Sequence, residues 1–288
     1  LLPSIEALPY ELHDPHSKRI FDSNDWRNFT ITEDHIRRAR RAYFANISYL
    51  DDKIGQLIDT LDRTNQEATI FFLSDHGDML GERGLWFKMS FFEGSARVPL
   101  MISAPNIMPR HETTPVSTID VCPTLCDFAE VSMKCVNPWI QGESLMPLMN
   151  GIERKSPVAM EYAAEASYAP LVSLRSGKYK YNRCNLDPEQ LFDLEEDPNE
   201  LNNLANQSEY IEILVQLQNM ANQRWNLDCF DEDVRRSQAR RSIVYNALRN
   251  GKYFPWDYQP LKLASDRFMR NHMNLNEVEQ NQRFPREE

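Results

Sequence analysis

Two side chains that can bind a metal ion, Asp75 and His76, stand side by side directly after a short apolar run. That run, residues 68–73, is rich in β-forming residues and predicts a buried strand. Three glycines follow within residues 77–84, which favours a loop over a helix. Ligands of open α/β sheets bind beyond the carboxyl ends of strands. Asp75, His76 and the cation Lys88, twelve residues beyond His76, are therefore candidates for one active site.

Local spacing leaves a second interpretation open for each of these residues. An Asp-His-Gly triplet is also typical of a polar turn, in which Asp75 would accept backbone hydrogen bonds. For Asp78 and Glu82 we favour the turn interpretation over a supporting role in a site. Trp86, two residues before Lys88, can pack beneath the loop or touch a cationic substrate through its ring face. Packing is the favoured interpretation for Trp86.

The longer stretch around these residues carries a family resemblance. Residues 74–88 read Ser-Asp-His-Gly-Asp-Met-Leu-Gly-Glu-Arg-Gly-Leu-Trp-Phe-Lys, and residues 95–100 read Ser-Ala-Arg-Val-Pro-Leu. This pattern resembles the metal-site region of the sulfatase family, most closely its choline-sulfatase branch. The resemblance implies that Asp75 and His76 are metal ligands and that Lys88 holds the sulfate group. It also implies one divalent metal ion, for which Ca²⁺ is the favoured identity and Mg²⁺ or Mn²⁺ are alternatives.

Other segments extend the resemblance over nearly the whole chain. Residues 117–125, 175–181 and 190–198 are similar to sulfatases as well, and the tail from Leu263, with Asn-His-Met-Asn at 271–274, resembles the choline-sulfatase branch in particular. The implied fold class is α/β: the C-terminal part of an alkaline-phosphatase-like doubly wound sheet, followed by a small antiparallel-sheet α+β subdomain and an extended tail. An isolated part of such a sheet would expose an open edge and apolar faces.

One part of the family pattern is missing. Sulfatases use a formylglycine nucleophile made from the Cys or Ser of a Cys/Ser-x-Pro-x-Arg motif, and this chain has no such motif. The family's first two metal aspartates are absent too. We therefore expect no catalytic nucleophile in this chain, a formylglycine upstream of it, and a polypeptide that is an incomplete piece, inactive alone.

The resemblance implies hydrolysis of a sulfate ester, choline O-sulfate, to choline and sulfate. Two alternatives stay open. The first is a phosphonate or phosphate ester hydrolase of the same superfamily. The second is a non-catalytic sulfatase remnant that binds a partner through its aromatic tail.

Composition and pattern divide the chain into three regions. Residues 1–150 are predicted to be the C-terminal portion of the catalytic α/β domain, and residues 151–230 a small antiparallel-sheet subdomain. Residues 231–288 are predicted to form a helix and a tail that serves oligomerisation or covers the active site. Within residues 1–30, predicted to be extended, His16 is expected on a surface loop.

Periodicity predicts the individual elements. A long amphipathic helix starts at the N-cap Thr32, and its arginines at 37, 38, 40 and 41 are expected on a solvated face. The remaining predictions are a strand over 98–104, a helix from Asp120 to about 130, four short strands at 158–162, 171–175, 178–181 and 190–194, and helices over 210–225 and 231–250.

The composition limits the classes of partner. Thirty-two Lys and Arg against 43 Asp and Glu give a net charge of −11, which argues against nucleic-acid binding. No apolar run approaches the roughly 20 residues of a membrane helix. The five cysteines predict buried free thiols in a reducing, cytoplasmic setting.

The tail contains an aromatic cluster over residues 253–258. We expect this cluster to dock on a neighbouring chain in a homo-oligomer. Alternatively, Trp256 and its neighbours form a cage for a quaternary ammonium group.

Overall fold

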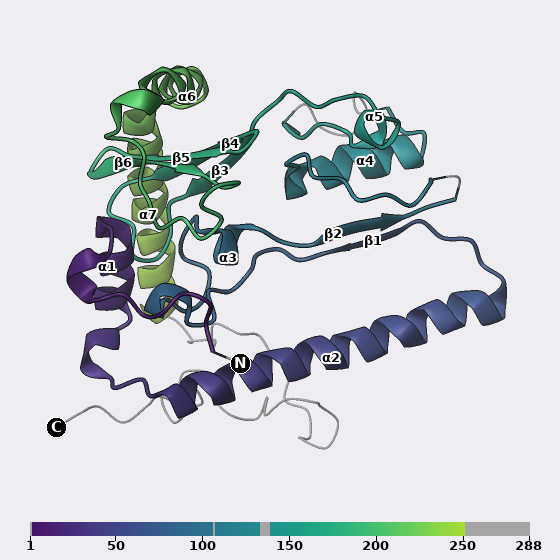
Figure 1. Ribbon diagram of the computed structural model, residues 1–288, viewed down its shortest axis with the longest axis horizontal. Helices are drawn as coiled ribbons and strands as arrows, with labels where there is room; N and C mark the ends of the chain where they lie inside the picture. Colours follow the sequence, from purple (N-terminus) through teal and green to yellow (C-terminus); the bar gives the residue numbers. More distant parts are fainter. Residues whose placement is uncertain (1, 106, 133–138, 251–288) are drawn as a thin grey trace.

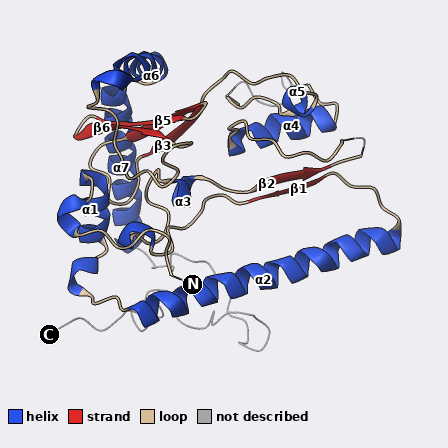
Figure 2. Cartoon of the chain, in the orientation of Figure 1, coloured by secondary structure: helices blue, strands red, loops and turns tan. Residues whose placement is uncertain are grey.

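The computed structural model describes residues 2–105, 107–132 and 139–250 of the chain (Figure 1). The helices are α1 (Pro15–Ser23), α2 (Glu33–Thr64), α3 (Glu93–Ala96), α4 (Val121–Phe128), α5 (Met146–Met149), α6 (Ile211–Arg224) and α7 (Leu227–Asn250). The strands are β1 (Ile70–Leu73), β2 (Leu100–Ser103), β3 (Val158–Tyr162), β4 (Leu171–Ser176), β5 (Tyr179–Cys184) and β6 (Asp187–Asp193). Figure 2 shows this mixture of helix and sheet, which agrees with the predicted α/β class.

The two strands that flank the candidate site form a two-stranded sheet. β1 and β2 pair antiparallel, with Ile70 opposite Ser103 and Leu73 opposite Leu100. Both were predicted from their apolar, β-forming composition, and both are confirmed. Because Leu73 is the last residue of β1, the chain leaves the sheet directly before Asp75.

The small antiparallel sheet is confirmed, with the strand order β3-β4-β5-β6. A two-residue turn at Gly177 joins β4 to β5, and Ser176 pairs with Tyr179 across it. Gly177 has a φ of +55°, a conformation in which a side chain is costly. Figure 1 shows α6 beside this sheet, and the core between them contains Leu174, Tyr181, Leu191, Leu214, Leu217 and Ala221.

The N-terminal region departs from the prediction. Residues 1–30 were expected to be extended, but they contain α1 and two short 3₁₀ turns. Asp14 caps α1 by accepting hydrogen bonds from the Ser17 amide and hydroxyl, and Pro15 occupies the first turn. Asp-Pro was therefore a helix start signal that the sequence interpretation missed. Ile20 of α1 is buried in a cluster with Met79, Leu85, Met89, Phe92, Phe192 and Leu194.

The long helix α2 begins where it was predicted. The Thr32 hydroxyl accepts from the His35 amide, and Asn65 ends the helix in the left-handed conformation. The expectation of a solvated arginine face is wrong for Arg40, which is 9% exposed. The buried guanidinium of Arg40 donates to the Leu80 carbonyl at 2.8 Å.

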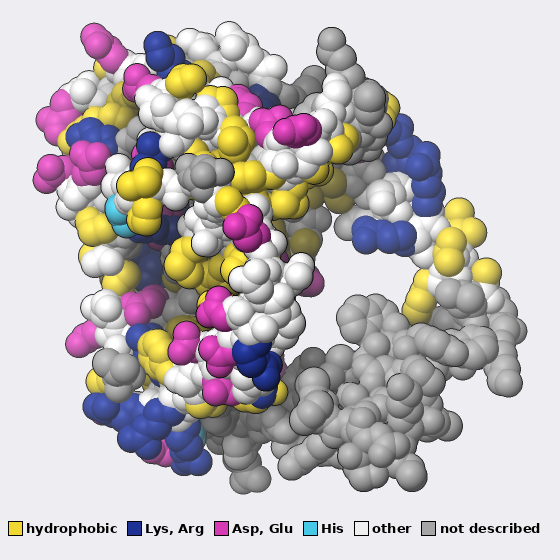
Figure 3. Space-filling view, turned by 90° about the vertical axis from the view of Figure 1, so that its right-hand side faces the viewer, with side chains coloured by type: hydrophobic (Ala, Val, Ile, Leu, Met, Phe, Trp, Pro, Cys, Tyr) yellow, Lys and Arg dark blue, Asp and Glu magenta, His cyan; other side chains and the backbone are white. Residues whose placement is uncertain are grey.

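Much of the apolar stripe of α2 faces outward. Ile47, Leu50, Leu57 and Ile58 all have exposed side chains, as does Met101 of β2. These side chains agree with the expectation of exposed apolar faces. Figure 3, which views the side at the right of Figure 1, also shows hydrophobic side chains gathered across the middle of that face.

Other expectations have mixed outcomes. Cys122 and Cys229 are exposed and Cys184 is buried, so the prediction of buried thiols is wrong for the first two. None of the helices in the described part of the chain contains the long apolar stretch that a membrane span requires. The aromatic cluster with Trp256 and the tail from Leu263 lie outside the described residues.

Candidate functional site

The turn after β1 orients the two candidate metal ligands. The Ser74 hydroxyl donates to the His76 carbonyl at 2.8 Å, and the His76 amide donates to Oδ1 of Asp75 at 2.9 Å. These bonds hold one carboxylate oxygen of Asp75 against the backbone. The His76 amide, followed by the charge of the His76 ring, lowers the pKa of Asp75, which keeps the exposed carboxylate ionised.

The ring of His76 has a defined tautomer. Nδ1 lies 2.8 Å from the carbonyl oxygen of Gly77. Because a carbonyl oxygen only accepts, Nδ1 must carry a hydrogen, and in the neutral form of the ring the lone pair is on Nε2. A backbone carbonyl that orients an imidazole in this way is a common outer partner of metal-binding histidines.

The two ligand atoms that remain face each other. Nε2 of His76 lies 3.5 Å from Oδ2 of Asp75. Two atoms at this separation can both reach one cation, since Ca²⁺–oxygen and metal–imidazole bonds are about 2.0–2.6 Å long. The pair therefore fits a divalent metal ion. Within the described ranges no group of three or more His, Cys, Asp or Glu side chains is arranged to hold a metal ion.

Gly77 brings the site against α3. A Cβ built on Gly77 would lie 2.2 Å from the carbonyl oxygen of Gly94, closer than real Cβ contacts allow. The Gly77 amide donates to the Ser95 carbonyl at 2.8 Å, so the two backbones are directly joined. Only glycine permits this approach, which holds His76 next to α3.

The loop from Asp78 to Phe87 has a strained backbone. Leu80, Arg83 and Phe87 have φ values of 48°, 59° and 66°, in the left-handed region that costs a non-glycine residue about 1–2 kcal/mol. Oδ1 of Asp78 accepts from the amides of Leu80 and Phe87, at 2.8 and 3.1 Å, and so closes the loop across its base. The turn interpretation of Asp78 agrees with these contacts.

Glu82 has a structural role in the same loop. Its carboxylate accepts from the Ser4 and Ile5 amides at 3.0 and 2.8 Å, and it lies 3.3 Å from the guanidinium of Arg40. Glu82 thus ties the N-terminal segment and α2 to the loop. These partners are distant in sequence, so no local pattern predicted them.

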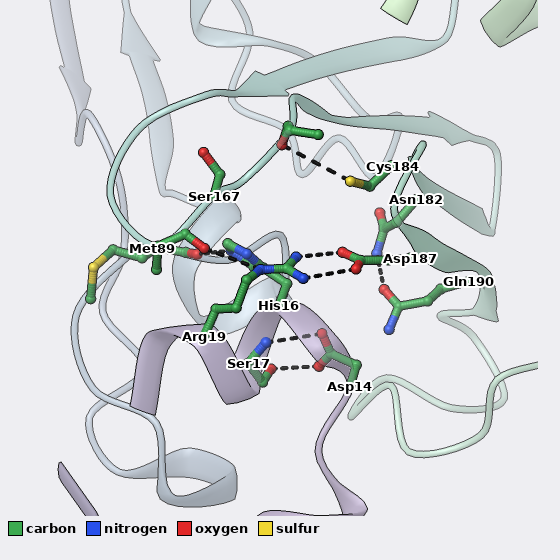
Figure 4. A network of polar contacts seen from close by, with 12 residues as sticks. Asp14, His16, Ser17, Arg19, Met89, Ser167, Asn182, Cys184, Asp187 and Gln190 are labelled. Atoms are coloured by element: carbon green, nitrogen blue, oxygen red, sulfur yellow. Dashed lines mark hydrogen bonds and ion pairs between the residues drawn. The ribbon is translucent and has the colours of Figure 1, made fainter. Parts of the chain in front are cut away.

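The candidate sulfate-binding residue follows the strained loop. Lys88 is exposed, and within the described residues its ammonium group has no hydrogen-bond or ion-pair partner. The backbone beside it is anchored, because Nε2 of His16 lies 2.6 Å from the Met89 carbonyl oxygen (Figure 4). His16 is 6% exposed, so the expectation of a surface-loop histidine is wrong. α1, which the sequence interpretation missed, carries it inward.

Trp86 is half-buried, and its ring lies over Gly81. A Cβ added to Gly81 would lie 3.2 Å from the Trp86 ring. This contact agrees with a packing role under the loop. The Asp75–His76 pair precedes this loop and Lys88 follows it, and the hydrogen bond from the Phe87 amide to Asp78 joins the two ends of the loop.

A buried ion cluster holds the segment after Lys88. The ammonium of Lys180, fully buried on β5, lies 2.8 Å from Glu93 and 2.6 Å from Glu200, and donates to the Phe91 carbonyl at 2.6 Å. Burial raises the pKa of Glu200, and the charge of Lys180 opposes this shift. Reasoning from the sequence missed this cluster, whose only signal is a lysine in the alternating Lys-Tyr-Lys-Tyr run that leads into β5.

Comparison with known proteins gives this geometry a context. The family described as "Sulfatase" matches residues 8–131, and "N-sulphoglucosamine sulphohydrolase, C-terminal" matches residues 81–226. "Choline sulfatase enzyme C terminal" matches residues 232–284. The choline-sulfatase of Rhizobium meliloti (strain 1021) is 59% identical over 293 aligned residues, which cover 100% of this chain and 57% of that protein.

Solved structures share the fold. Phosphonate monoester hydrolase SpPMH from Silicibacter pomeroyi superposes with a TM-score of 0.65 at 23% identity, over 78% of this chain and 50% of that chain. A 2-O GAG sulfatase superposes with a TM-score of 0.60 at 23% identity, over 82% and 53%. The chain thus spans about half the length of these proteins. From the family matches and the identity over its whole length, this chain belongs to the sulfatase family.

Proposed function

We propose that this chain provides two metal ligands and a sulfate-binding cation to an enzyme that hydrolyses choline O-sulfate to choline and sulfate. The observation that carries the proposal is the pair Asp75 and His76. Their free ligand atoms lie 3.5 Å apart, with the imidazole tautomer set for metal binding. The choice of ester is supported by the 59% identity to a choline-sulfatase.

Each residue then has a chemical role. Asp75 contributes a hard anionic oxygen and His76 a neutral nitrogen, a donor set that suits Ca²⁺ first and also admits Mg²⁺ or Mn²⁺. A divalent ion, when bound, offsets the charge of the sulfuryl oxygens. Lys88 holds a sulfate oxygen as a compact point charge.

The nucleophile belongs outside this chain in our proposal. The sequence has no Cys/Ser-x-Pro-x-Arg motif and spans 57% of its choline-sulfatase relative. The exposed apolar faces of α2 and β2 are consistent with a further part of the catalytic domain that covers them. The formylglycine and further metal ligands would then come from upstream sequence, and the chain alone would be inactive.

The first test is the intact mass of the protein isolated from its natural source. A mass well above 33.7 kDa, with peptides upstream of Leu1 that contain the Cys or Ser motif, supports the sulfatase proposal. A mass near 33.7 kDa contradicts it and favours the non-catalytic remnant.

The second test compares substrates on that isolated protein. A phosphonate ester hydrolase is the alternative, because a phosphonate monoester hydrolase shares the fold. Choline O-sulfate and a methyl phosphonate ester are assayed side by side with the metal added. Faster turnover of choline O-sulfate supports the proposal, and faster turnover of the phosphonate overturns the choice of substrate.

The proposal includes assembly into a homo-oligomer in the cytoplasm. The family match to the choline sulfatase C terminus, residues 232–284, includes the end of α7. In that part of α7 Ile243 and Val244 are 70% and 58% exposed, which supports a contact with another chain.

A further inference from the structure

Gly77 connects the candidate metal pair to α3 through its backbone. Its amide donates to the Ser95 carbonyl at 2.8 Å, and its own carbonyl oxygen accepts from Nδ1 of the His76 ring at 2.8 Å. A Cβ at Gly77 would lie 2.2 Å from the Gly94 carbonyl oxygen, so the two backbones are in close contact. A displacement of α3 would therefore displace Gly77 and, with it, the support of the His76 imidazole.

α3 is too short to hold this position by itself. It contains four residues, Glu93–Ala96, and the side chain of its N-cap residue, Phe92, forms no capping hydrogen bond. A single helical turn is unstable in isolation, because ordering the first turn costs more free energy than its hydrogen bonds return. The position of α3 is therefore set by contacts with other parts of the chain.

The ammonium group of Lys180 makes contacts of this kind. Lys180 lies on β5 with a fully buried side chain, and Figure 1 shows α3 between the small sheet and β2. Its nitrogen donates to the Phe91 carbonyl at 2.6 Å and to the Glu93 carboxylate at 2.8 Å, and it lies 2.6 Å from the Glu200 carboxylate. An ammonium has three N–H donors, so the acceptors equal the donors in number. Two of these acceptors, on Phe91 and Glu93, belong to the residues that lead into α3.

Glu200 also contacts the start of α3. Oε2 of its carboxylate accepts from the Glu93 amide at 2.7 Å, while Oε1 is the atom beside Lys180. The Glu200 backbone has a φ of +56°, which a residue with a side chain rarely adopts. Its carbonyl accepts from the Arg83 guanidinium at 2.9 Å, and Arg83 belongs to the strained loop that follows the metal pair. Glu200 thus joins α3 to that loop.

Stability alone does not account for this cluster. Replacement of a buried ion pair by well-packed apolar side chains is often neutral or stabilising. The next residue of β5, Tyr181, packs in the core with α6, because successive residues of a strand point to opposite faces. The face that carries Lys180 contacts α3 through hydrogen bonds instead. Hydrogen bonds are directional, whereas apolar contacts are not, so they fix the position of α3.

We propose that Lys180 and Glu200 are positioning residues of the metal site: they fix α3, and α3 fixes Gly77 and the His76 imidazole. The small antiparallel sheet then takes part in the metal site through α3, although Lys180 itself is no ligand. This inference rests on the proposed function, because it takes Asp75 and His76 as the metal pair.

Two variants remove the Lys180 contacts. Lys180→Met keeps a side chain of similar length without the ammonium group. The double variant Lys180→Met/Glu200→Gln also removes the buried carboxylate charge, so it should be more stable than Lys180→Met.

Two further variants are controls. Lys178→Met is the same substitution at a lysine that pairs with Asp193 at 2.6 Å. Leu217→Ala truncates a fully buried side chain in the core that α6 shares with the small sheet, so it lowers stability at a distance from the cluster.

The first measurement is hydrogen exchange of the peptide that covers residues 74–80, in the protein at its naturally produced length and without added metal. Exchange should accelerate about fivefold in Lys180→Met and in the double variant, the effect of one lost hydrogen bond. Both controls should stay within about twofold of the parent, well below that effect. Unchanged exchange in both Lys180 variants would show that the cluster does not hold Gly77, and would overturn the proposal.

The second measurement is calorimetric titration with Ca²⁺ and, separately, with Mn²⁺, at a temperature where every variant is folded. The dissociation constant should rise about tenfold in Lys180→Met, at the lower end of the effect of residues that support a metal ligand from outside. The double variant should show a similar rise although it is more stable than Lys180→Met. Leu217→Ala should bind as the parent does although it is less stable. Parental affinity in both Lys180 variants, or a comparable loss in Leu217→Ala, overturns the positioning role.

Asp75→Asn distinguishes this inference from the proposed function. If Asp75→Asn binds both ions as tightly as the parent, or the parent binds neither, the metal pair is wrong and the proposed function fails. The exchange measurement still decides whether the cluster holds Gly77. If instead Asp75→Asn weakens binding and the Lys180 variants do not, the metal pair stands and only the positioning role fails.

Discussion

Nε2 of His76 lies 3.5 Å from Oδ2 of Asp75, and the Gly77 carbonyl fixes the hydrogen of the same imidazole on Nδ1. The pair thus leaves one ring nitrogen and one carboxylate oxygen close together and without a hydrogen bond among the described residues. A polar turn would need only Oδ1 of Asp75, which already accepts from the His76 amide. Nε2 of His76 and Oδ2 of Asp75 take no part in the turn, and their short separation favours the interpretation as a metal site.

Removal of one ligand should weaken metal binding. We expect Asp75→Asn to weaken Ca²⁺ or Mn²⁺ binding by at least about tenfold, because affinity in such sites follows the number of charged ligands. Calorimetric titration of the isolated natural protein measures the change. Asp59→Asn on the exposed face of α2 is the matched control. Equal affinities of the parent and Asp75→Asn would show that Asp75 is a turn residue only.

Gly77 and Gly55 should respond in opposite directions to alanine. In Gly77→Ala the new Cβ would lie 2.2 Å from the Gly94 carbonyl oxygen, and overpacking of this kind costs about 1–3 kcal/mol or more. Gly55, inside α2, has no atom within 4 Å of the added carbon, so Gly55→Ala should stabilise the helix by about 0.5–1 kcal/mol. Thermal unfolding measures both. A Gly77→Ala protein as stable as the parent would mean that the loop does not approach α3 this closely.

The Lys180 cluster should show strong coupling. Lys180→Met leaves Glu200 buried without its partner, and a broken buried pair costs about 3–5 kcal/mol. Glu200→Gln removes the negative charge instead. The double variant should lose less stability than the sum of the two single losses, because the second change relieves the uncompensated charge. Urea unfolding of the parent, the two single variants and the double variant gives the free energies for this double-mutant cycle. If the two single losses of stability simply add up in the double variant, Lys180 and Glu200 do not interact directly.

Stability should fall on mild acidification. Burial lowers the pKa of His13 and of His16, so between the folded value and the ordinary value near 6.5 only the unfolded chain binds the protons. Their contribution is complete above about pH 6.5 and decreases as the pH falls, by up to about 1.4 kcal/mol per pH unit for each histidine. Urea midpoints measured from pH 7.5 to 5 test this. The dependence of the urea midpoint on pH should become weaker in His13→Gln and in His16→Gln. An unchanged pH dependence in both variants would show that these histidines do not cause the loss of stability.

Deletion of residues 263–288 tests the proposed oligomer. If the tail joins chains, the truncated protein should sediment as a smaller assembly than the intact protein. Both proteins are compared by analytical ultracentrifugation at the same concentration. An unchanged number of chains per particle would place the contact elsewhere, for example on the exposed residues Ile243 and Val244 of α7.

Local patterns predicted much of the fold. Three features depend only on residues that are close in the chain, so local sequence patterns predict them. They are the β-forming run of β1, the capping threonine of α2 and the alternating strands of the small sheet. The order Asp75-His76-Gly77 after a strand likewise placed the candidate ligands at the end of β1. Their interpretation as metal ligands came from family resemblance.

The sequence by itself therefore determined most of the elements after residue 30, the family and the adjacency of Asp75 and His76, because these follow from short-range pattern and motif. Tertiary structure alone decided the burial of His16, the ion cluster of Lys180 with Glu93 and Glu200, and the contacts of Glu82 with residues some 77 and 42 positions away. Burial and ion pairing depend on which distant segments meet, and one-dimensional periodicity does not specify those meetings.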